Sequence, residues 1–323
     1  MHRHISLVIC ALAIVIGAGA WIRSTSFAAS TKQATTAMQN PVLRIPIGEK
    51  GDDLKAQNDL TIDQGSLAGL TFYEVGRIAT GTEPRVEIVS GDRTLSLPQA
   101  TKVFMDEDTD QGWPIGDISV SIKMPDYPGK DASDAAYEEY DRAVYTLYKD
   151  IVQRIRAAGY ERYYSPREPR LTGAATYFFE RAYKKVPIYW EDDETLLIPQ
   201  DPYYELTFDD WKHLRADPTW TWYAADVFIR LNYSRRYEGV NQGDTFSVDI
   251  KNDRTLMIGY DPQQNSDLEA AIENYKNTVP KKYRRRAELE VRARKNGIPI
   301  ASDYKDPKIL GIEVPSYEEW SSH

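Results

Sequence analysis

The side chains that most enzymes use as a base or a nucleophile are scarce in this chain. Beyond an apolar amino-terminal segment that ends at Ile22 there is no cysteine, and the histidines are His213 and the terminal His323. A serine or cysteine nucleophile normally needs a neighbouring base. His213 is the one positioned candidate, and no Gly-x-Ser-x-Gly motif accompanies it. We therefore interpret His213 as an ordinary, partly packed histidine and predict no catalytic residue.

Metal and phosphate sites of the common kinds are not predicted either. Zinc sites built from His or Cys need more of these residues than the chain has beyond Ile22, and no glycine-rich phosphate loop of standard spacing occurs. Residues 106–112 resemble a calcium loop with alternating carboxylates. However, Gln111 replaces the glycine of the sharp turn, and Asp117 replaces the bidentate glutamate. We interpret this run as a solvated loop, with calcium as the alternative, and we predict no metal and no cofactor.

Two acidic segments are the most distinctive candidates for a binding surface. Clustered like charge steers a partner and fixes its orientation, so we predict that these segments bind a basic protein, with a role in solubility alone as the alternative. The second segment forms the tip of a hairpin that residues 186–190 and 195–199 predict. The predicted binding residues are Asp106, Glu107, Asp108 and Asp110 in the first segment and Glu191, Asp192, Asp193 and Glu194 in the second.

The amino-terminal segment predicts export. Residues 5–22 contain no charged side chain, follow Arg3, and include Ala18-Gly19-Ala20 ahead of Trp21, which is the pattern of a cleavable signal peptide. A helix of this length spans roughly 27 Å, enough to cross the hydrocarbon core of a bilayer. Residues 1–23 are therefore either a cleaved signal or an anchor in the inner membrane. In both cases we predict that the remainder of the chain is periplasmic.

The composition restricts the partners. A formal net charge of −9 disfavours nucleic acid and anionic membrane surfaces, because both repel a net anion. A cationic protein partner is easier to accommodate. The one cysteine, Cys10, lies in the apolar segment, so the exported part is expected to fold without disulfides. The 22 tyrosines and seven tryptophans serve the core or, alternatively, an aromatic binding face.

Periodicity predicts both strands and helices. The clearest helix covers residues 134–158, with Ser133 as its N-cap and Gly159 at its end. A capping box of Thr207 and Asp210 predicts a short helix, and Ser266 with Glu269 predicts another. Strand-like composition marks residues 70–78, 85–89, 118–124, 227–233, 245–250 and 255–260, and we expect 70–78 to pair with 85–89.

The last predicted helix, residues 280–295, is rich in lysine and arginine. We interpret it as a solvated face with internal salt bridges through Glu288 and Glu290. Contact with anionic lipid or cell-wall polymer is the alternative.

Together these elements predict an α+β fold of mainly antiparallel sheets, each packed by amphipathic helices, with two similar strand-then-helix halves as one possible arrangement. The predicted organisation begins with a flexible tether over residues 24–66, since residues 24–40 lack apolar periodicity. A first α+β unit follows over 67–165, and a second over 166–323 begins after a proline-containing link.

Three segments carry a family resemblance. Residues 154–163 (RIRAAGYERY), 169–173 (PRLTG) and 222–226 (WYAAD) resemble uncharacterised exported proteins of beta-proteobacteria. Those proteins are in turn similar to immunity proteins encoded beside type VI secretion effectors, particularly lipase-type effectors. The resemblance implies a periplasmic, non-enzymatic inhibitor that occludes the active site of an incoming toxin, and it assigns no functional residue.

Two other classes of function remain open. One is an envelope hydrolase that uses paired carboxylates, because the separation of such pairs in space is not visible in a sequence. The other is a structural component of an envelope or secretion assembly, which would self-associate.

Overall fold

The computed structural model describes residues 41–76, 81–180, 183, 199–215, 217–235, 243–258 and 268–312. The predicted signal or anchor, residues 1–23, and the acidic hairpin tip, Glu191–Glu194, lie outside these residues. In the described part of the chain, no helix is both long enough and apolar enough to cross a membrane.

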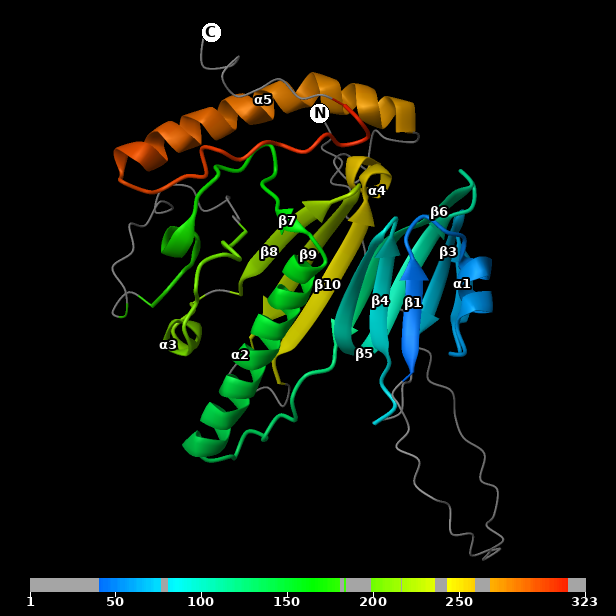
Figure 1. The fold of residues 1–323 in the computed structure, drawn as a ribbon, viewed down its shortest axis with the longest axis horizontal. Coiled ribbons are helices and arrows are strands. Elements are labelled where there is room, and N and C mark those ends of the chain that lie inside the picture. Colours follow the sequence, from blue (N-terminus) through cyan, green and yellow to red (C-terminus); the bar gives the residue numbers. More distant parts are fainter. Residues whose placement is uncertain are drawn as a thin grey trace, which may run out of the picture. The chain divides into compact units, whose positions relative to one another are not determined.

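The predicted α+β class is confirmed, because helices accompany a large, mostly antiparallel sheet (Figure 1). The sheet has ten strands in the described residues. Its main path is β1 (Val42–Pro46), β4 (Arg85–Ser90), β5 (Arg93–Asp108), β6 (Trp113–Ile122), β10 (Thr245–Asn252), β9 (Val227–Ser234), β8 (Thr219–Ala224) and β7 (Glu161–Arg162). Off this path, β3 (Leu70–Val75) pairs with both β5 and β2 (Asp63–Leu67). The pair β1 and β4 is parallel.

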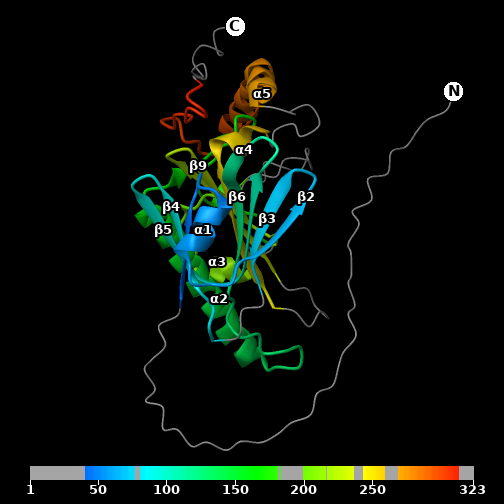
Figure 2. The same cartoon turned by 90° about the vertical axis from the view of Figure 1, so that its right-hand side faces the viewer.

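The long strand β5 connects two parts of the sheet. Its first half pairs with β4, and its second half pairs with β3 and β6. The expected pairing of 70–78 with 85–89 is therefore wrong, since β3 and β4 lie on either side of α1 (Gly51–Gln57) in Figure 2 and both pair with β5. Strand-like composition does not show which strands pair with each other, and β5, the strand that pairs with both, was not predicted from the sequence.

One face of the sheet is covered by α2 (Asp134–Ala157), the clearest helix of the sequence. As predicted, the Ser133 side chain caps it by accepting a hydrogen bond from the Ala136 amide, at 3.3 Å. Gly159 ends it with a φ of +81°, which favours glycine. The residues that α2 buries are Tyr140, Val144, Tyr148, Ile151, Val152 and Ile155.

The core between α2 and the sheet is aromatic. Tyr148 lies 4.6 Å from Trp220 and 5.2 Å from Trp211, measured between ring centroids, and both tryptophans are fully buried. Trp211 belongs to α3 (Phe208–Lys212), which begins with the predicted capping box of Thr207 and Asp210. Much of the unusual tyrosine and tryptophan content therefore serves packing.

Two elements near the carboxyl end differ from expectation. The expected strand 255–260 is wrong over its described residues, which belong to the helix α4 (Asp253–Ile258). A short apolar run fits either element, and here the Asn252 side chain accepts a hydrogen bond from the Thr255 amide, at 2.9 Å. The two expected helices after residue 266 are one helix, α5 (Leu268–Lys295), with Pro280 inside it. Burial of Val279 and Tyr283 on one face offsets the hydrogen bond that proline removes.

The tether predicted to reach residue 66 ends earlier, because β1 and α1 lie within it and β2 begins within it. These elements are short, and α1 has no side-chain cap, so their sequence signal is weak. Gly51 of α1 lies against the ring of Tyr73, where a Cβ atom would come within 1.8 Å. Glycine is therefore required for this close contact.

The expected units 67–165 and 166–323 share one sheet, since β6 pairs with β10 over Asp117–Ser121. The chain from Asn40 onward forms a single compact unit. Its remaining short element is the 3-10 helix η1 (Gly173–Thr176).

Candidate binding pocket

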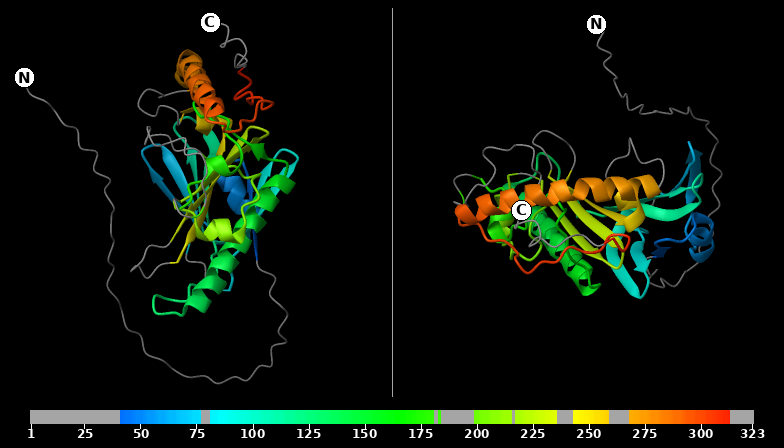
Figure 3. Two further views of the ribbon diagram at one scale, coloured as in Figure 1. Left: turned by 90° about the vertical axis from the view of Figure 1, so that its left-hand side faces the viewer. Right: turned by 90° about the horizontal axis from the view of Figure 1, so that it is seen from above.

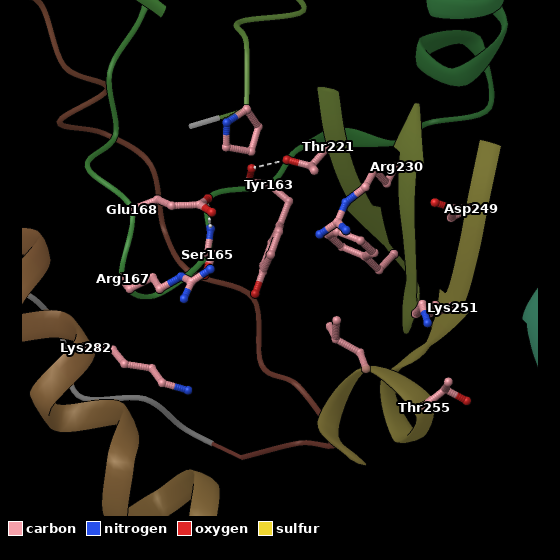
Figure 4. A pocket seen from close by; sticks show the side chains of 13 residues that line it. Tyr163, Ser165, Arg167, Glu168, Thr221, Arg230, Asp249, Lys251, Thr255 and Lys282 are labelled. Atoms are coloured by element: carbon pink, nitrogen blue, oxygen red, sulfur yellow. Dashed lines mark hydrogen bonds between the residues drawn. The ribbon is translucent and has the colours of Figure 1, made fainter. Parts of the chain in front are cut away.

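The face of the sheet opposite α2 is polar, and a pocket of about 500 Å³ lies on it. Strand alternation creates this face. In β9, Ile229 and Leu231 are fully buried in the core, whereas Arg230 between them is exposed on the other side. Pairing places Arg230 in register with Thr221 of β8 and Asp249 of β10. The pocket is completed by residues 163–168, α4 and α5 (Figure 4).

Its floor is aromatic. Tyr163 and Phe228 pack edge to face, with ring centroids 5.2 Å apart. Two hydrogen bonds fix the Tyr163 backbone beside β8: its amide donates to the Thr221 carbonyl at 3.0 Å, and its carbonyl accepts from the Thr221 hydroxyl at 2.8 Å. The floor is thus a rigid, apolar surface below polar walls.

Positive charge dominates the walls. The lining cations are Arg167, Arg230, Lys251 and Lys282. Lys251 is neutralised by Asp117, whose Oδ2 lies 2.5 Å from its Nζ. By contrast, Arg167 and Arg230 are exposed and form no ion pair within the described ranges, although the charges of both act on nearby Glu168. Figure 4 shows these two arginines on either side of Tyr163, one from the loop and one from the sheet.

The two lining carboxylates, Glu168 and Asp249, are held differently. Glu168 is 8% exposed, accepts the Ser165 amide at 3.0 Å, and forms no ion pair with a described cation. Burial raises the pKa of Glu168, a shift that the Ser165 amide and nearby arginines oppose. Asp249 accepts hydrogen bonds from the side-chain Nδ2 of Asn232 at 2.8 Å and from the Ser119 hydroxyl at 3.1 Å. Because Lys251 is neutralised by Asp117, the other three lining cations face these two carboxylates, and the lining keeps a net positive charge in a chain of net charge −9.

Buried charges hold the pocket loop against α5. Arg170 contacts Glu290 through Nε and Nη2, each at 2.8 Å. Arg286 contacts Asp306 at 2.7 Å and donates to the Ser165 carbonyl at 2.8 Å. Both residues that α5 contributes are almost fully buried.

The expectation of a solvated face on residues 280–295 is therefore only partly correct. The pair Arg285–Glu288 is an exposed intrahelical pair of the expected kind, at 3.4 Å. Glu290, however, points inward and is fully buried, although it also lies 3.7 Å from the more exposed Arg294.

The first predicted acidic segment does not form a loop. Asp106, Glu107 and Asp108 end β5, and their side chains have different surroundings. Glu107 accepts hydrogen bonds from the Tyr73 hydroxyl at 2.6 Å and the Gly51 amide at 3.0 Å. Asp108 accepts one from the Gln111 amide at 2.9 Å, whereas Asp110 is exposed in the following turn.

These four residues do not line the pocket, and their role in partner binding stays a prediction. The loop expected over residues 106–112 is shorter than predicted, because strand pairing of β5 with β6 continues to Asp108 and only the turn after it remains.

Among the described residues, no group of three or more His, Cys, Asp or Glu side chains is placed to hold a metal ion.

No residue of this pocket was predicted from the sequence as a binding residue. Alternation of apolar and polar residues in 227–233 and 245–250 could have identified Arg230 and Asp249 as outward-facing, but no motif joins them to Arg167 across the chain.

His213 lies outside the pocket. Its ring stacks on Tyr183, with ring centroids 4.0 Å apart, and its Nδ1 lies 2.8 Å from the Asp209 carbonyl oxygen.

Comparison with protein-family models, with curated proteins and with solved structures finds no match for this chain. Arginines beside an aromatic floor suit the binding of carboxylate or phosphate groups. The serine and threonine hydroxyl groups that line the pocket have no histidine beside them to act as a base, since no histidine is among its described lining residues.

Proposed function

We propose that this protein is a non-enzymatic binding protein that holds an anionic group of its partner between α5 and the polar face of the sheet. The observation that carries the proposal is the pair of exposed arginines, Arg167 and Arg230, which lack carboxylate partners in the described chain. Each guanidinium can bind a carboxylate with two parallel hydrogen bonds. An incoming anion therefore displaces no existing ion pair.

A protein partner fits the pocket better than a single small ion. A volume of about 500 Å³ accommodates several side chains of an inserted loop and falls within the range of ligand pockets. Tyr163 and Phe228 offer an apolar surface for the remainder of that loop. Aromatic and arginine residues are also the usual sources of binding energy at protein interfaces.

Within this proposal, the partner is a toxin and the protein is its periplasmic immunity protein. The export segment 5–22 and the family resemblance of residues 154–163, 169–173 and 222–226 support this role. The last residue of the first segment, Tyr163, and Thr221 immediately before the third lie at the pocket. Binding would cover the toxin active site, as the resemblance implies for lipase-type effectors.

The test uses the purified full chain and the toxin encoded beside it. We expect binding that suppresses toxin activity. The double variant Arg167→Ala/Arg230→Ala should raise the dissociation constant by roughly 100-fold or more, because charge-paired arginines at interfaces contribute about 2–5 kcal/mol. Isothermal titration calorimetry measures the affinity. Arg85→Ala, which removes an exposed arginine from β4, is the matched control and should bind as the parent does. Unchanged affinity of the double variant would contradict the proposed pocket.

A carboxylate-dependent hydrolase is the second candidate, because Glu168 and Asp249 line one pocket in unlike environments. Such enzymes use one carboxyl group with a raised pKa as an acid and keep the other ionised. Turnover of a cell-wall polysaccharide by the pure protein, abolished by either Glu168→Gln or Asp249→Asn, would establish this function. Absence of turnover together with toxin binding would support the binding proposal.

A further inference from the structure

The outward face of α5 carries exposed cations along its length. Residues 276–295 contain nine lysines and arginines against two glutamates, in a chain of net charge −9. The exposed members of this set, here called the basic face, are Lys276, Lys281, Arg284, Arg285, Arg294 and Lys295. The only exposed carboxylate in the same stretch is Glu288.

Helical spacing aligns the centre of the basic face. Lys281, Arg284, Glu288, Val291 and Lys295 follow one another three or four residues apart and therefore form one stripe. The stripe is about 21 Å long at 1.5 Å per residue. The buried side of the same helix, which includes Tyr283, Arg286 and Glu290, points in the opposite direction, so packing fixes the stripe outward.

Most of this charge is not neutralised by the protein itself. Lys281, Arg284 and Lys295 have no ion pair with another described residue. Val291, an apolar side chain that is 60% exposed, lies in the middle of the stripe. Helix α5 lies at the rim of the molecule, as Figures 1 and 3 show. Its outward stripe therefore presents three cations that form no ion pair within the described chain, Lys281, Arg284 and Lys295.

We infer that the basic face of α5 docks on the headgroups of an anionic lipid bilayer. A straight stripe of cations around an apolar side chain matches a flat layer of anions, with Val291 entering between the headgroups. The net charge of −9 does not prevent this contact, because charges beyond a Debye length of about 8 Å are screened. The pocket and this face use different sides of α5, so the inference is independent of the proposed toxin binding.

The test places a fluorescent reporter at the centre of the stripe. The full chain carries Val291→Cys labelled with an environment-sensitive dye, in a Cys10→Ser background, and is reconstituted in vesicles of phosphatidylcholine alone or mixed with phosphatidylglycerol. We expect emission to shift to shorter wavelength only in the anionic vesicles. The shift should be lost at high salt and in the triple variant Lys281→Glu/Arg284→Glu/Lys295→Glu.

Two controls make the result specific. The same dye at Leu67→Cys, an apolar residue of β2 that is 71% exposed, should report no difference between the vesicles. Unchanged near-ultraviolet circular dichroism of the triple variant shows that it remains folded. Equal emission from Val291→Cys in both vesicle types would overturn the inference, as would an equal shift caused by soluble polyglutamate or nucleic acid without vesicles.

Discussion

At the scale of single residues, Asp106 is a carboxyl group on the polar face of the sheet whose pKa is raised toward neutral pH. It lies directly opposite Asp117 in the pairing of β5 with β6. Burial, followed by the charge of Asp117, raises the pKa of Asp106 to about 6, while Lys251 opposes the shift. Two like charges opposite each other destabilise paired strands, so the ionised form of Asp106 disfavours the fold.

The effect of Asp106 on stability depends on pH. Because the pKa of Asp106 is higher in the folded than in the unfolded chain, its contribution to stability is complete in acid and is lost as the pH rises through about 6. Asp106→Asn should therefore raise the melting temperature at about pH 8 and change it little at about pH 4. Thermal unfolding followed by circular dichroism measures both values. Asp92→Asn, at a side chain that is 93% exposed, is the control and should have no pH-dependent effect.

Part of the candidate site was accessible from the sequence at this scale. The alternation of 245–250 places Asp249 on the polar side of a half-buried strand, and the same argument applies to Arg230 in 227–233. Arg167 and Glu168 lie in an irregular segment, where periodicity carries no information. Their position depends on buried ion pairs, and a sequence does not show which of its charges pair.

At the scale of elements, α5 is joined to the rest of the fold by ionic contacts as well as apolar ones. Its apolar contacts include Tyr275, Val279 and Tyr283, which pack on Met257 of α4 and Phe228 of β9 in one cluster. Farther along the helix, Glu290 accepts three hydrogen bonds from Arg170, one of them from its backbone amide. The position of α5 as a wall of the pocket therefore depends on the Arg170–Glu290 ion pair.

Removal of one member of the pair should be costly. Glu290→Ala leaves the Arg170 guanidinium buried without its carboxylate, and we expect the free energy of unfolding to fall by about 3–5 kcal/mol. Urea denaturation measures the change. The double variant Arg170→Met/Glu290→Leu removes both charges and should recover much of the loss. A single variant as stable as the parent would show that the pair does not hold α5.

Long, strongly periodic elements were predicted well, and short or unusual ones were not. The bounds of α2, β9 and β10 agree with the sequence within one or two residues, because each has many residues in one pattern. The helix α4 has only six residues, which is too few to show helical periodicity in the sequence. The continuity of α5 through Pro280 reflects burial on both sides of the proline, which only the packed structure reveals.

At the scale of the whole molecule, one core runs through both halves that the sequence suggested. Leu97 of β5 and Leu231 of β9 are fully buried members of the same cluster. Sequence composition changes near residue 165, and the proline-containing link there is typical of a boundary. However, β6 pairs with β10 across that point, and such nonlocal pairing is not visible in local composition.

A shared core predicts cooperative unfolding. Leu97→Ala and Leu231→Ala should each lower the midpoint of one common transition, with a loss of about 2–5 kcal/mol for each buried leucine. Urea titration followed by both tryptophan fluorescence and far-ultraviolet circular dichroism tests this. Two transitions, of which each substitution moves only one, would indicate separate units.

The pocket combines segments that are far apart in the order of synthesis. Its floor comes from Tyr163 and Phe228, whereas one wall comes from Lys282 on α5. A chain emerging from a ribosome or a translocation channel, amino terminus first, therefore has no finished pocket until α5 has emerged and docked. The proposed capture of a partner therefore requires synthesis of the chain at least as far as α5.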